Sequence, residues 1–170
     1  MLIFLVGYMG AGKSSVGQLL AQKLNYRFID TDSWIENRCC KSISELFEIY
    51  GEGYFRTKEK ECIEFLVGKE KTVIATGGGL PCCNDLMSLM NELGEVVYLQ
   101  ASTATLSNRL FSDTSCRPLI EDVQSESEMS GFIKSHLSER EKVYNSSKHK
   151  IEVDELKLLE AASIISSKLF

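Results

Sequence analysis

The stretch Gly7-Tyr-Met-Gly-Ala-Gly-Lys-Ser14 has the spacing G-x-x-x-x-G-K-S, the pattern of a phosphate-binding P-loop. It follows the apolar run 2–6, which predicts a buried strand, and it precedes 16–24, whose apolar residues recur at helical spacing. An ordinary glycine-rich turn between a strand and a helix is the alternative. The order strand, loop, helix favours the phosphate site.

Each residue type in this loop has a use in holding a polyphosphate. Gly7, Gly10 and Gly12 permit backbone conformations that a side chain forbids. Successive N–H groups and the helix N-terminus can then point at phosphate oxygens. Lys13 supplies a charge for the terminal phosphates, and the Ser14 hydroxyl suits Mg²⁺. The expected nucleotide-binding residues of the loop are Gly10, Ala11, Gly12, Lys13, Ser14 and Ser15.

Length and composition indicate one ordinary globular domain over residues 1–170, with 44% hydrophobic and 25% charged residues. The formal net charge of −5 argues against a nucleic-acid-binding protein. No apolar run approaches the ~20 residues that span a bilayer, and the N-terminus lacks the charged region of a signal peptide. We therefore expect a monomer in the cytoplasm that binds neither nucleic acid nor membrane.

The cysteines raise the question of disulfides or a metal site. Adjacent cysteine pairs do not make a disulfide framework, and the C-x-x-C spacing of zinc sites is absent. A P-loop enzyme also belongs in a reducing compartment. We expect six free thiols, at Cys39, Cys40, Cys62, Cys82, Cys83 and Cys116.

Two acidic residues follow the second predicted strand, 26–29, in the sequence Asp30-Thr-Asp32. In a parallel sheet the carboxyl end of a strand faces the ligand site. The alternative is a solvated turn in which Asp32 caps the next helix. Beside a P-loop we favour the functional interpretation.

The remaining pattern alternates strands with helices. Strands are expected at 72–75, 95–99 and 151–153, and helices at 101–110, 132–144 and from 156 onward. A largely helical insert, 33–62, separates the second and third strands, with one of its helices beginning near Gly53. About five strands in alternation with helices predict an α/β domain with a mostly parallel sheet.

Three further features are candidates for an acceptor site. Gly77, Gly78 and Gly79 follow the third strand and indicate close backbone approach to a ligand or a helix, although a flexible loop is the alternative. Residues 111–130 are polar and weakly periodic, which is typical of an active-site lid. Arg56 and Arg140 would clamp a carboxylate if both face one cleft, although each alone is more often a surface residue.

In these segments the chain resembles the shikimate kinase family of nucleoside-monophosphate-kinase-like P-loop proteins. The resemblance covers nearly the whole chain. It rests on residues 7–17, 28–32 with 35–36, 44–47 with 51–56, 76–79, 117–119, and Arg140 with Tyr144. It implies a three-layer P-loop fold and transfer of the ATP γ-phosphate to the 3-hydroxyl of shikimate, a step toward the aromatic amino acids.

The resemblance also implies roles for the acceptor residues. Asp32 matches the residue that binds the shikimate hydroxyls and is the favoured base, and Asp30 the one that helps to hold a single Mg²⁺, usually through water. Arg56 and Arg140 match the pair that grips the shikimate carboxylate. The glycines at 77–79 match those whose backbone contacts the ring.

On the nucleotide side, Arg117 matches the lid arginine that closes onto the ATP phosphates, and Arg109 matches an arginine that stacks on adenine. The catalytic residues expected are thus Asp32, Lys13 and Arg117. Two rival functions remain: another small-metabolite kinase of the same fold, such as a gluconate kinase, and a nucleotide-binding switch with no acceptor.

Overall fold

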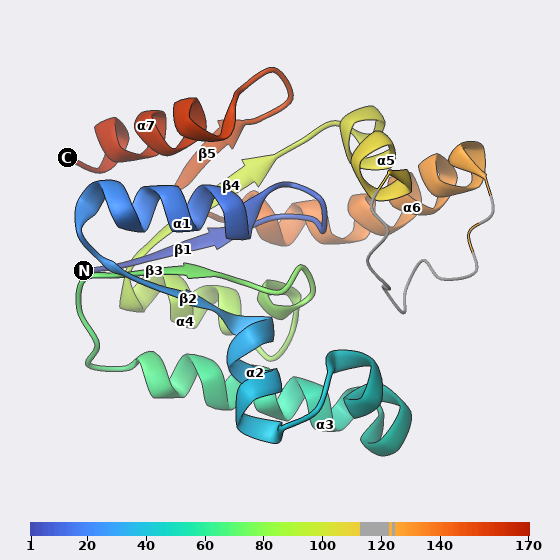
Figure 1. The fold of residues 1–170 in the computed structure, drawn as a ribbon, viewed down its shortest axis with the longest axis horizontal. Coiled ribbons are helices and arrows are strands. Elements are labelled where there is room, and N and C mark those ends of the chain that lie inside the picture. Colours follow the sequence, from blue (N-terminus) through green and yellow to red (C-terminus); the bar gives the residue numbers. More distant parts are fainter. Residues whose placement is uncertain (113–122, 124) are drawn as a thin grey trace.

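The computed structural model describes residues 1–112, 123 and 125–170. Strands and helices alternate along the chain, as predicted (Figure 1). The strands are β1 (Leu2–Val6), β2 (Arg27–Asp30), β3 (Thr72–Ala75), β4 (Glu95–Gln100) and β5 (His149–Glu152). The helices are α1 (Lys13–Leu24), α2 (Thr31–Cys39), α3 (Ile43–Leu66), the 3₁₀ turn η1 (Leu80–Cys82), α4 (Leu86–Leu93), α5 (Thr103–Phe111), α6 (Glu126–Tyr144) and α7 (Leu158–Leu169).

The five strands form one sheet in the order β2-β3-β1-β4-β5, and every neighbouring pair is parallel. Right-handed crossovers require α1, which leads to β2, to lie on the opposite face from the helices that lead to β3, β4 and β5. Helix α1 packs against α7 and the sheet, whereas α3 contacts α4 and α4 contacts β4. The prediction of a three-layer α/β fold is confirmed.

The main core surrounds the three inner strands, β3, β1 and β4. Every residue of β1 and of β3 is buried, which explains their continuous apolar sequences. A separate small cluster lies between α2 and α3 and contains Ile35, Leu46 and Phe55. The helices of the predicted insert therefore have a small apolar core of their own, beside the main one.

The structure confirms one predicted boundary and corrects others. Two helical stretches of α3 meet at a kink at Gly51, where φ is 77° and ψ is 173°, so a helical stretch does begin close to Gly53, as predicted. A helix expected from Pro81 onward begins later: Pro81 lies in the short η1, and α4 starts at Leu86. Helix α6 starts at Glu126 and therefore includes the end of the predicted lid 111–130. Residues 113–122 and 124, with Arg117 and Cys116, lie outside the described residues.

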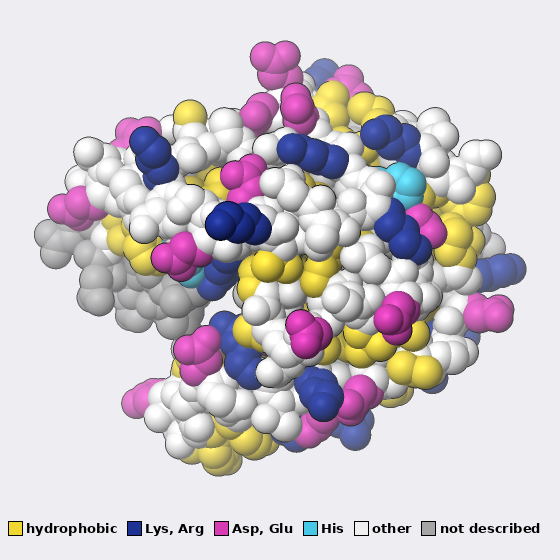
Figure 2. Space-filling model, turned by 180° about the vertical axis from the view of Figure 1, so that it is seen from behind, with side chains coloured by type: hydrophobic (Ala, Val, Ile, Leu, Met, Phe, Trp, Pro, Cys, Tyr) yellow, Lys and Arg dark blue, Asp and Glu magenta, His cyan; other side chains and the backbone are white. Residues whose placement is uncertain are grey.

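The surface agrees with the balanced composition. On the face shown in Figure 2, acidic and basic side chains are interspersed, and the described ones form no continuous basic patch. Within the described ranges, no helix has both the length and the apolar character needed to cross a bilayer. Cys39, Cys40, Cys62, Cys82 and Cys83 are free thiols, as expected for these residues.

Candidate active site

The P-loop joins β1 to α1 at the carboxyl end of the sheet. Its glycines have positive φ angles, 139° at Gly7, 82° at Gly10 and 91° at Gly12. At Gly7 a Cβ would lie 2.6 Å from the carbonyl oxygen of Leu99, so the loop also needs a residue without a side chain to lie against β4.

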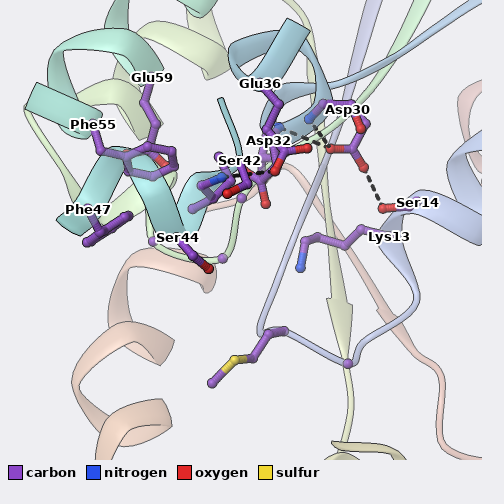
Figure 3. Close-up of a pocket in the computed structure, with 18 of the residues that line it drawn as sticks. Lys13, Ser14, Asp30, Asp32, Glu36, Ser42, Ser44, Phe47, Phe55 and Glu59 are labelled. Atoms are coloured by element: carbon purple, nitrogen blue, oxygen red, sulfur yellow. Dashed lines mark hydrogen bonds between the residues drawn. The ribbon is translucent and has the colours of Figure 1, made fainter. Parts of the chain in front are cut away.

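Two polar side chains leave this loop. Lys13 is buried, and its ammonium group donates to the carbonyls of Gly7 at 2.9 Å and Tyr8 at 2.8 Å. The Ser14 hydroxyl donates to Oδ2 of Asp30 at 2.6 Å (Figure 3). The loop thus presents one cation and one hydroxyl at the mouth of a cleft.

Asp30 holds two elements together. Its Oδ1 accepts from the backbone N–H groups of Asp32 at 3.0 Å and Ser33 at 3.3 Å, so Asp30 caps the N-terminus of α2. The alternative considered from the sequence, in which Asp32 is the cap, is wrong. With Asp30 serving as the cap, the side chain of Asp32 lines the cleft.

Ser14 and Asp30 provide hard oxygen donors side by side, which suits Mg²⁺. Both Asp30 oxygens already accept hydrogen bonds, so a contact through water fits this residue better than direct coordination. Among the described residues, His, Cys, Asp and Glu form no cluster of three or more that would hold a metal without a substrate. Mg²⁺ typically retains waters and binds substrate phosphates, so the pair fits it.

The third strand brings the glycine run to the same place. The N–H of Gly77 donates to the buried Thr31 hydroxyl at 2.8 Å, which ties the run to the start of α2. A Cβ at Gly77 would lie 2.7 Å from Oδ1 of Asp32 and 3.2 Å from Oε1 of Glu59. The backbone of this glycine therefore lies directly against two acidic side chains.

Glu59, on α3, is a residue that the sequence analysis missed. It is buried, and its Oε2 accepts from Nη1 of Arg56 at 2.7 Å. Its Oε1 has no hydrogen-bond partner among the described residues. Burial raises the pKa of the Glu59 carboxyl to about 7; Arg56 opposes the shift, and the nearby Asp32 reinforces it.

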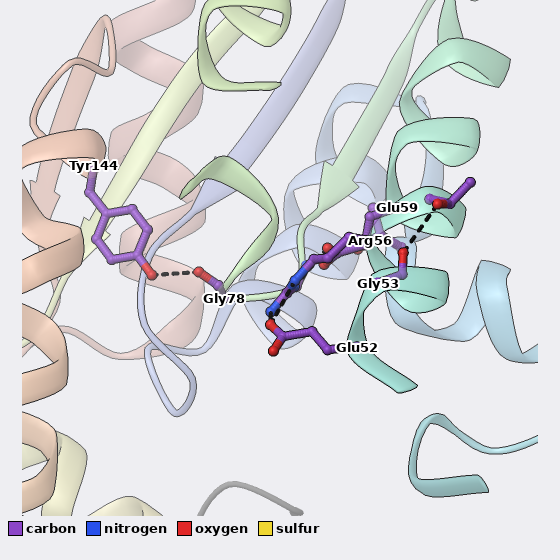
Figure 4. A network of polar contacts seen from close by, with 9 residues as sticks. Glu52, Gly53, Arg56, Glu59, Gly78 and Tyr144 are labelled. Atoms are coloured by element: carbon purple, nitrogen blue, oxygen red, sulfur yellow. Dashed lines mark hydrogen bonds and ion pairs between the residues drawn. The ribbon is translucent and has the colours of Figure 1, made fainter. Parts of the chain in front are cut away.

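Arg56 lies between two acids (Figure 4). Its Nε and Nη2 donate to Oε1 of Glu52 at 3.1 and 2.7 Å, while Nη1 serves Glu59. Burial works against the charge, but these ion pairs dominate and raise the pKa of Arg56, which keeps the guanidinium charged. An R-x-x-E spacing on a helix is the sequence signal that would have found Glu59.

Helix α6 closes the other wall. Burial raises the pKa values of Glu59, Tyr8 and Tyr144, and Arg140 lies close enough for its charge to oppose part of that rise. The Tyr144 hydroxyl donates to the carbonyl of Gly78 at 2.6 Å (Figure 4). Its ring packs at a tilt against Tyr98, with centroids 5.2 Å apart. Tyr144 therefore fixes the glycine run from the α6 side.

One cleft of about 1390 Å³ contains most of the predicted site residues. Figure 3 shows Asp32 between the Ser14–Asp30 pair on one side and Phe47 with Phe55 on the other. The predicted residues that line the cleft are Gly10, Gly12, Lys13, Ser14, Ser15, Asp30, Asp32, Arg56, Gly77, Gly78, Gly79, Arg109 and Arg140.

Of the other predicted residues, one lies away from the cleft and one is not described, while a third, which lines the cleft, makes a structural contact. Ala11 is buried behind the loop, where its N–H donates to the Tyr8 carbonyl at 3.2 Å. Arg117 is outside the described residues. Arg109 donates to the carbonyls of Gly10 at 3.2 Å and Val153 at 3.4 Å, so it joins the P-loop to the segment after β5.

Comparison with known proteins identifies the family. A family model described as shikimate kinase matches residues 9–169. The chain belongs to the shikimate kinase family. A shikimate kinase of Azobacteroides pseudotrichonymphae is 46% identical over 144 residues, which is 84% of each protein. The protein is accordingly an ATP-dependent kinase. Membership of the shikimate kinase family excludes the two alternatives considered from the sequence, a nucleotide-binding switch and a gluconate kinase.

Solved structures agree. The shikimate kinase of Bacteroides thetaiotaomicron superposes with a TM-score of 0.93 at 36% identity, covering 99% of this chain and 98% of the other. The Acinetobacter baumannii shikimate kinase in complex with shikimate gives 0.87 at 31% identity, over 99% and 92%. The family and fold inferred from the sequence are both confirmed.

Proposed function

We propose that this cleft transfers the γ-phosphoryl group of ATP to the 3-hydroxyl of shikimate, with Asp32 between donor and acceptor. The observation that carries the proposal is the convergence on one cleft of the P-loop, the acidic pair, the glycine run and two arginines from separate helices. A hydrolase needs no such acceptor pocket. The family supports the same assignment.

The donor half works by position and charge. The backbone amides of the P-loop and the Lys13 ammonium surround the β- and γ-phosphates. They neutralise phosphate charge, which is the main contribution that a protein makes to phosphoryl transfer. Lys13 would exchange its contacts with the Gly7 and Tyr8 carbonyls for phosphate oxygens. A bound Mg²⁺ would supply positive charge that offsets the negative charge of the phosphates. Ser14 and Asp30 are the residues that would hold it.

The acceptor half orients a small hydroxy acid. Arg56 and Arg140 bind its carboxylate from opposite walls, and the Gly77–Gly79 backbone lies along its ring. Asp32 accepts a hydrogen bond from the 3-hydroxyl and takes its proton as the phosphoryl group arrives. Residues 111–130 serve as a lid that brings Arg117 to the phosphates, and Arg109 lines the adenine side.

We also propose a cytoplasmic location and a monomeric state for the protein. The described cysteines are free thiols, which suits a reducing cytoplasm. One copy of the chain supplies the described residues that the proposed mechanism uses, which is compatible with an active monomer. Gel filtration with light scattering at assay concentration tests the second assignment, and an activity that appears only with dimerisation would overturn it.

The direct test is an assay of purified protein with ATP and Mg²⁺, following ADP release with shikimate and separately with gluconate. We expect ADP release that depends on shikimate. We also expect a product that is heavier than shikimate by one phosphoryl group, with that group on the 3-hydroxyl. Release that is equal with no acceptor, or that depends on gluconate, would refute the proposal.

A further inference from the structure

The guanidinium of Arg56 is already engaged on its side edges. Nε and Nη2 both donate to one carboxylate oxygen of Glu52, at 3.1 and 2.7 Å, and Nη1 donates to Glu59 at 2.7 Å. The remaining edge, between Nη1 and Nη2, faces Gly79. A Cβ on Gly79 would lie 2.9 Å from Nη1 and 3.0 Å from Nη2.

This arrangement leaves no open edge for a second bidentate partner. A carboxylate binds an arginine fork best through two parallel N–H···O bonds along one edge. With Gly79 against one edge and an acid on each of the others, an incoming carboxylate must displace a group that is present. When both acids are ionised, their two negative charges exceed the single positive charge of Arg56, and the excess repels an incoming anion until Glu52 or Glu59 moves away.

The two acids differ in their freedom to leave. The Glu59 side chain is 1% exposed, and that of Glu52 is 65% exposed. Glu52 also lies between Gly51 and Gly53, and a Cβ at either glycine would meet no atom within 4 Å. The backbone at Gly51 has φ 77°, outside the helical range, and interrupts α3 one residue before Glu52. The exposed partner therefore lies between two glycines with open space around them, next to a break in the helix.

We propose that Glu52 is a stand-in for the acceptor: its carboxylate occupies the Nε–Nη2 edge of Arg56 in the open cleft, and the acceptor's carboxylate takes its place. The inference rests on the proposed role of Arg56 as a carboxylate ligand. Glu59 remains as the fixed partner that orients the guanidinium. Glu52 is then a positioning residue that acts through Arg56.

The exchange has a consequence for selectivity. Replacing one carboxylate by another keeps the charge on Arg56 balanced, whereas a neutral polyol leaves Glu52 in place, projecting into the cleft. The cost is affinity, because the acceptor binds only the fraction of molecules whose arginine edge is free. Weakening the internal competitor should therefore tighten binding of the acceptor.

The test is the substitution Glu52→Gln, with shikimate binding measured by calorimetry and the Michaelis constants for shikimate and ATP measured separately. A neutral amide competes less well, since charge-assisted bonds are about twice as strong as neutral ones. We expect the dissociation constant for shikimate to fall by about three- to tenfold, with the change confined to the acceptor. An unchanged or raised constant would overturn the inference.

Matched variants separate this result from others. Glu48→Gln removes the same charge from an exposed position on α3 outside the cleft, and should leave shikimate binding unchanged. In the double variant Arg56→Ala with Glu52→Gln, the gain should vanish, because the two residues act as one unit. If Glu52→Gln fails to fold, Glu52→Asp withdraws the carboxylate by one methylene and should tighten binding in the same direction.

The outcome also distinguishes the two proposals. If Arg56→Ala leaves shikimate binding intact, the acceptor site itself is misassigned. If Arg56→Ala and Glu52→Gln both weaken shikimate binding, the assignment of the acceptor site is retained. In that case Glu52 only holds Arg56 in position, and the proposal that Glu52 competes with the acceptor carboxylate is refuted.

Discussion

At the donor end of the cleft the groups offered to phosphate belong to one continuous loop, Gly7–Ser14, whereas at the acceptor end they come from α2, α3, α6 and the segment after β3. The donor end is built mainly from backbone, with glycines at positive φ. The acceptor end is built from charged side chains that hold one another. A loop motif fixes the first locally, but only the complete fold assembles the second.

This difference explains what the sequence could predict. The P-loop and the order of strands and helices were readable because each depends on neighbouring residues. Arg56 and Arg140 lie far apart in the chain, and spacing alone left their orientation open; the resemblance to a family suggested the pair. Glu52 and Glu59 lie four residues before and three residues after Arg56 on α3, a helical spacing that the sequence analysis did not use. The spacing could have suggested the ion pairs, but only the fold buries Glu59 and brings both acids to the cleft.

A substitution at Asp32 should have the largest effect, because this residue lies between the donor end and the acceptor end of the cleft. We expect Asp32→Asn to lower kcat by about a thousandfold, because the amide cannot accept the hydroxyl proton. ATP binding, which depends on the loop, should remain nearly intact in a fluorescent-nucleotide titration. Equal turnover in the variant would remove Asp32 from the mechanism.

Arg56→Ala tests whether the acceptor end is independent of the donor end. Loss of a bidentate carboxylate contact should raise the KM for shikimate by about a hundredfold and change the KM for ATP little. Arg38→Ala, an exposed arginine on α2 outside the cleft, is the control. An effect mainly on the ATP constant would show that the carboxylate contact is misassigned.

Glu59 tests the buried charge at the acceptor end through the pH dependence of stability. Its pKa is about 7 in the folded chain against an ordinary 4.5. The folded state therefore favours the protonated acid, and the stabilisation present below about pH 4.5 is lost as pH rises through 7. Relative to Glu59→Gln, the parent should lose up to about 3 kcal/mol of unfolding free energy over this range.

Denaturant unfolding of both proteins at pH 5, 6, 7 and 8 measures this difference. Above pH 7 the unfolding free energies of the parent and of Glu59→Gln should change with pH in the same way. The charges facing Glu59 are those of Arg56, Asp32 and Arg140. The same unfolding series on Arg56→Lys, which keeps the positive charge beside Glu59, measures how far the pH dependence relies on the arginine itself. Identical pH dependence in parent and Glu59→Gln would mean that the carboxyl is not perturbed.

Tyr144→Phe gives the smallest effect, because it removes one hydroxyl and keeps the ring. Without the 2.6 Å bond to the Gly78 carbonyl, the glycine run loses one hydrogen bond to α6. We expect the KM for shikimate to rise by roughly three- to tenfold, the range of one lost hydrogen bond, with the ATP constant unchanged. Tyr98→Phe alters the stacked partner outside the cleft and should leave both constants unaltered.

The most direct measurement is a crystal structure of the chain with shikimate, Mg²⁺ and a non-hydrolysable ATP analogue. The account predicts one shikimate in the cleft, with its carboxylate between Arg56 and Arg140. It also predicts the Asp32 carboxylate within hydrogen-bond reach, about 2.6–3.2 Å, of the 3-hydroxyl that faces the γ-phosphate. A shikimate bound outside this cleft, or held with Asp32 beyond contact, would contradict it.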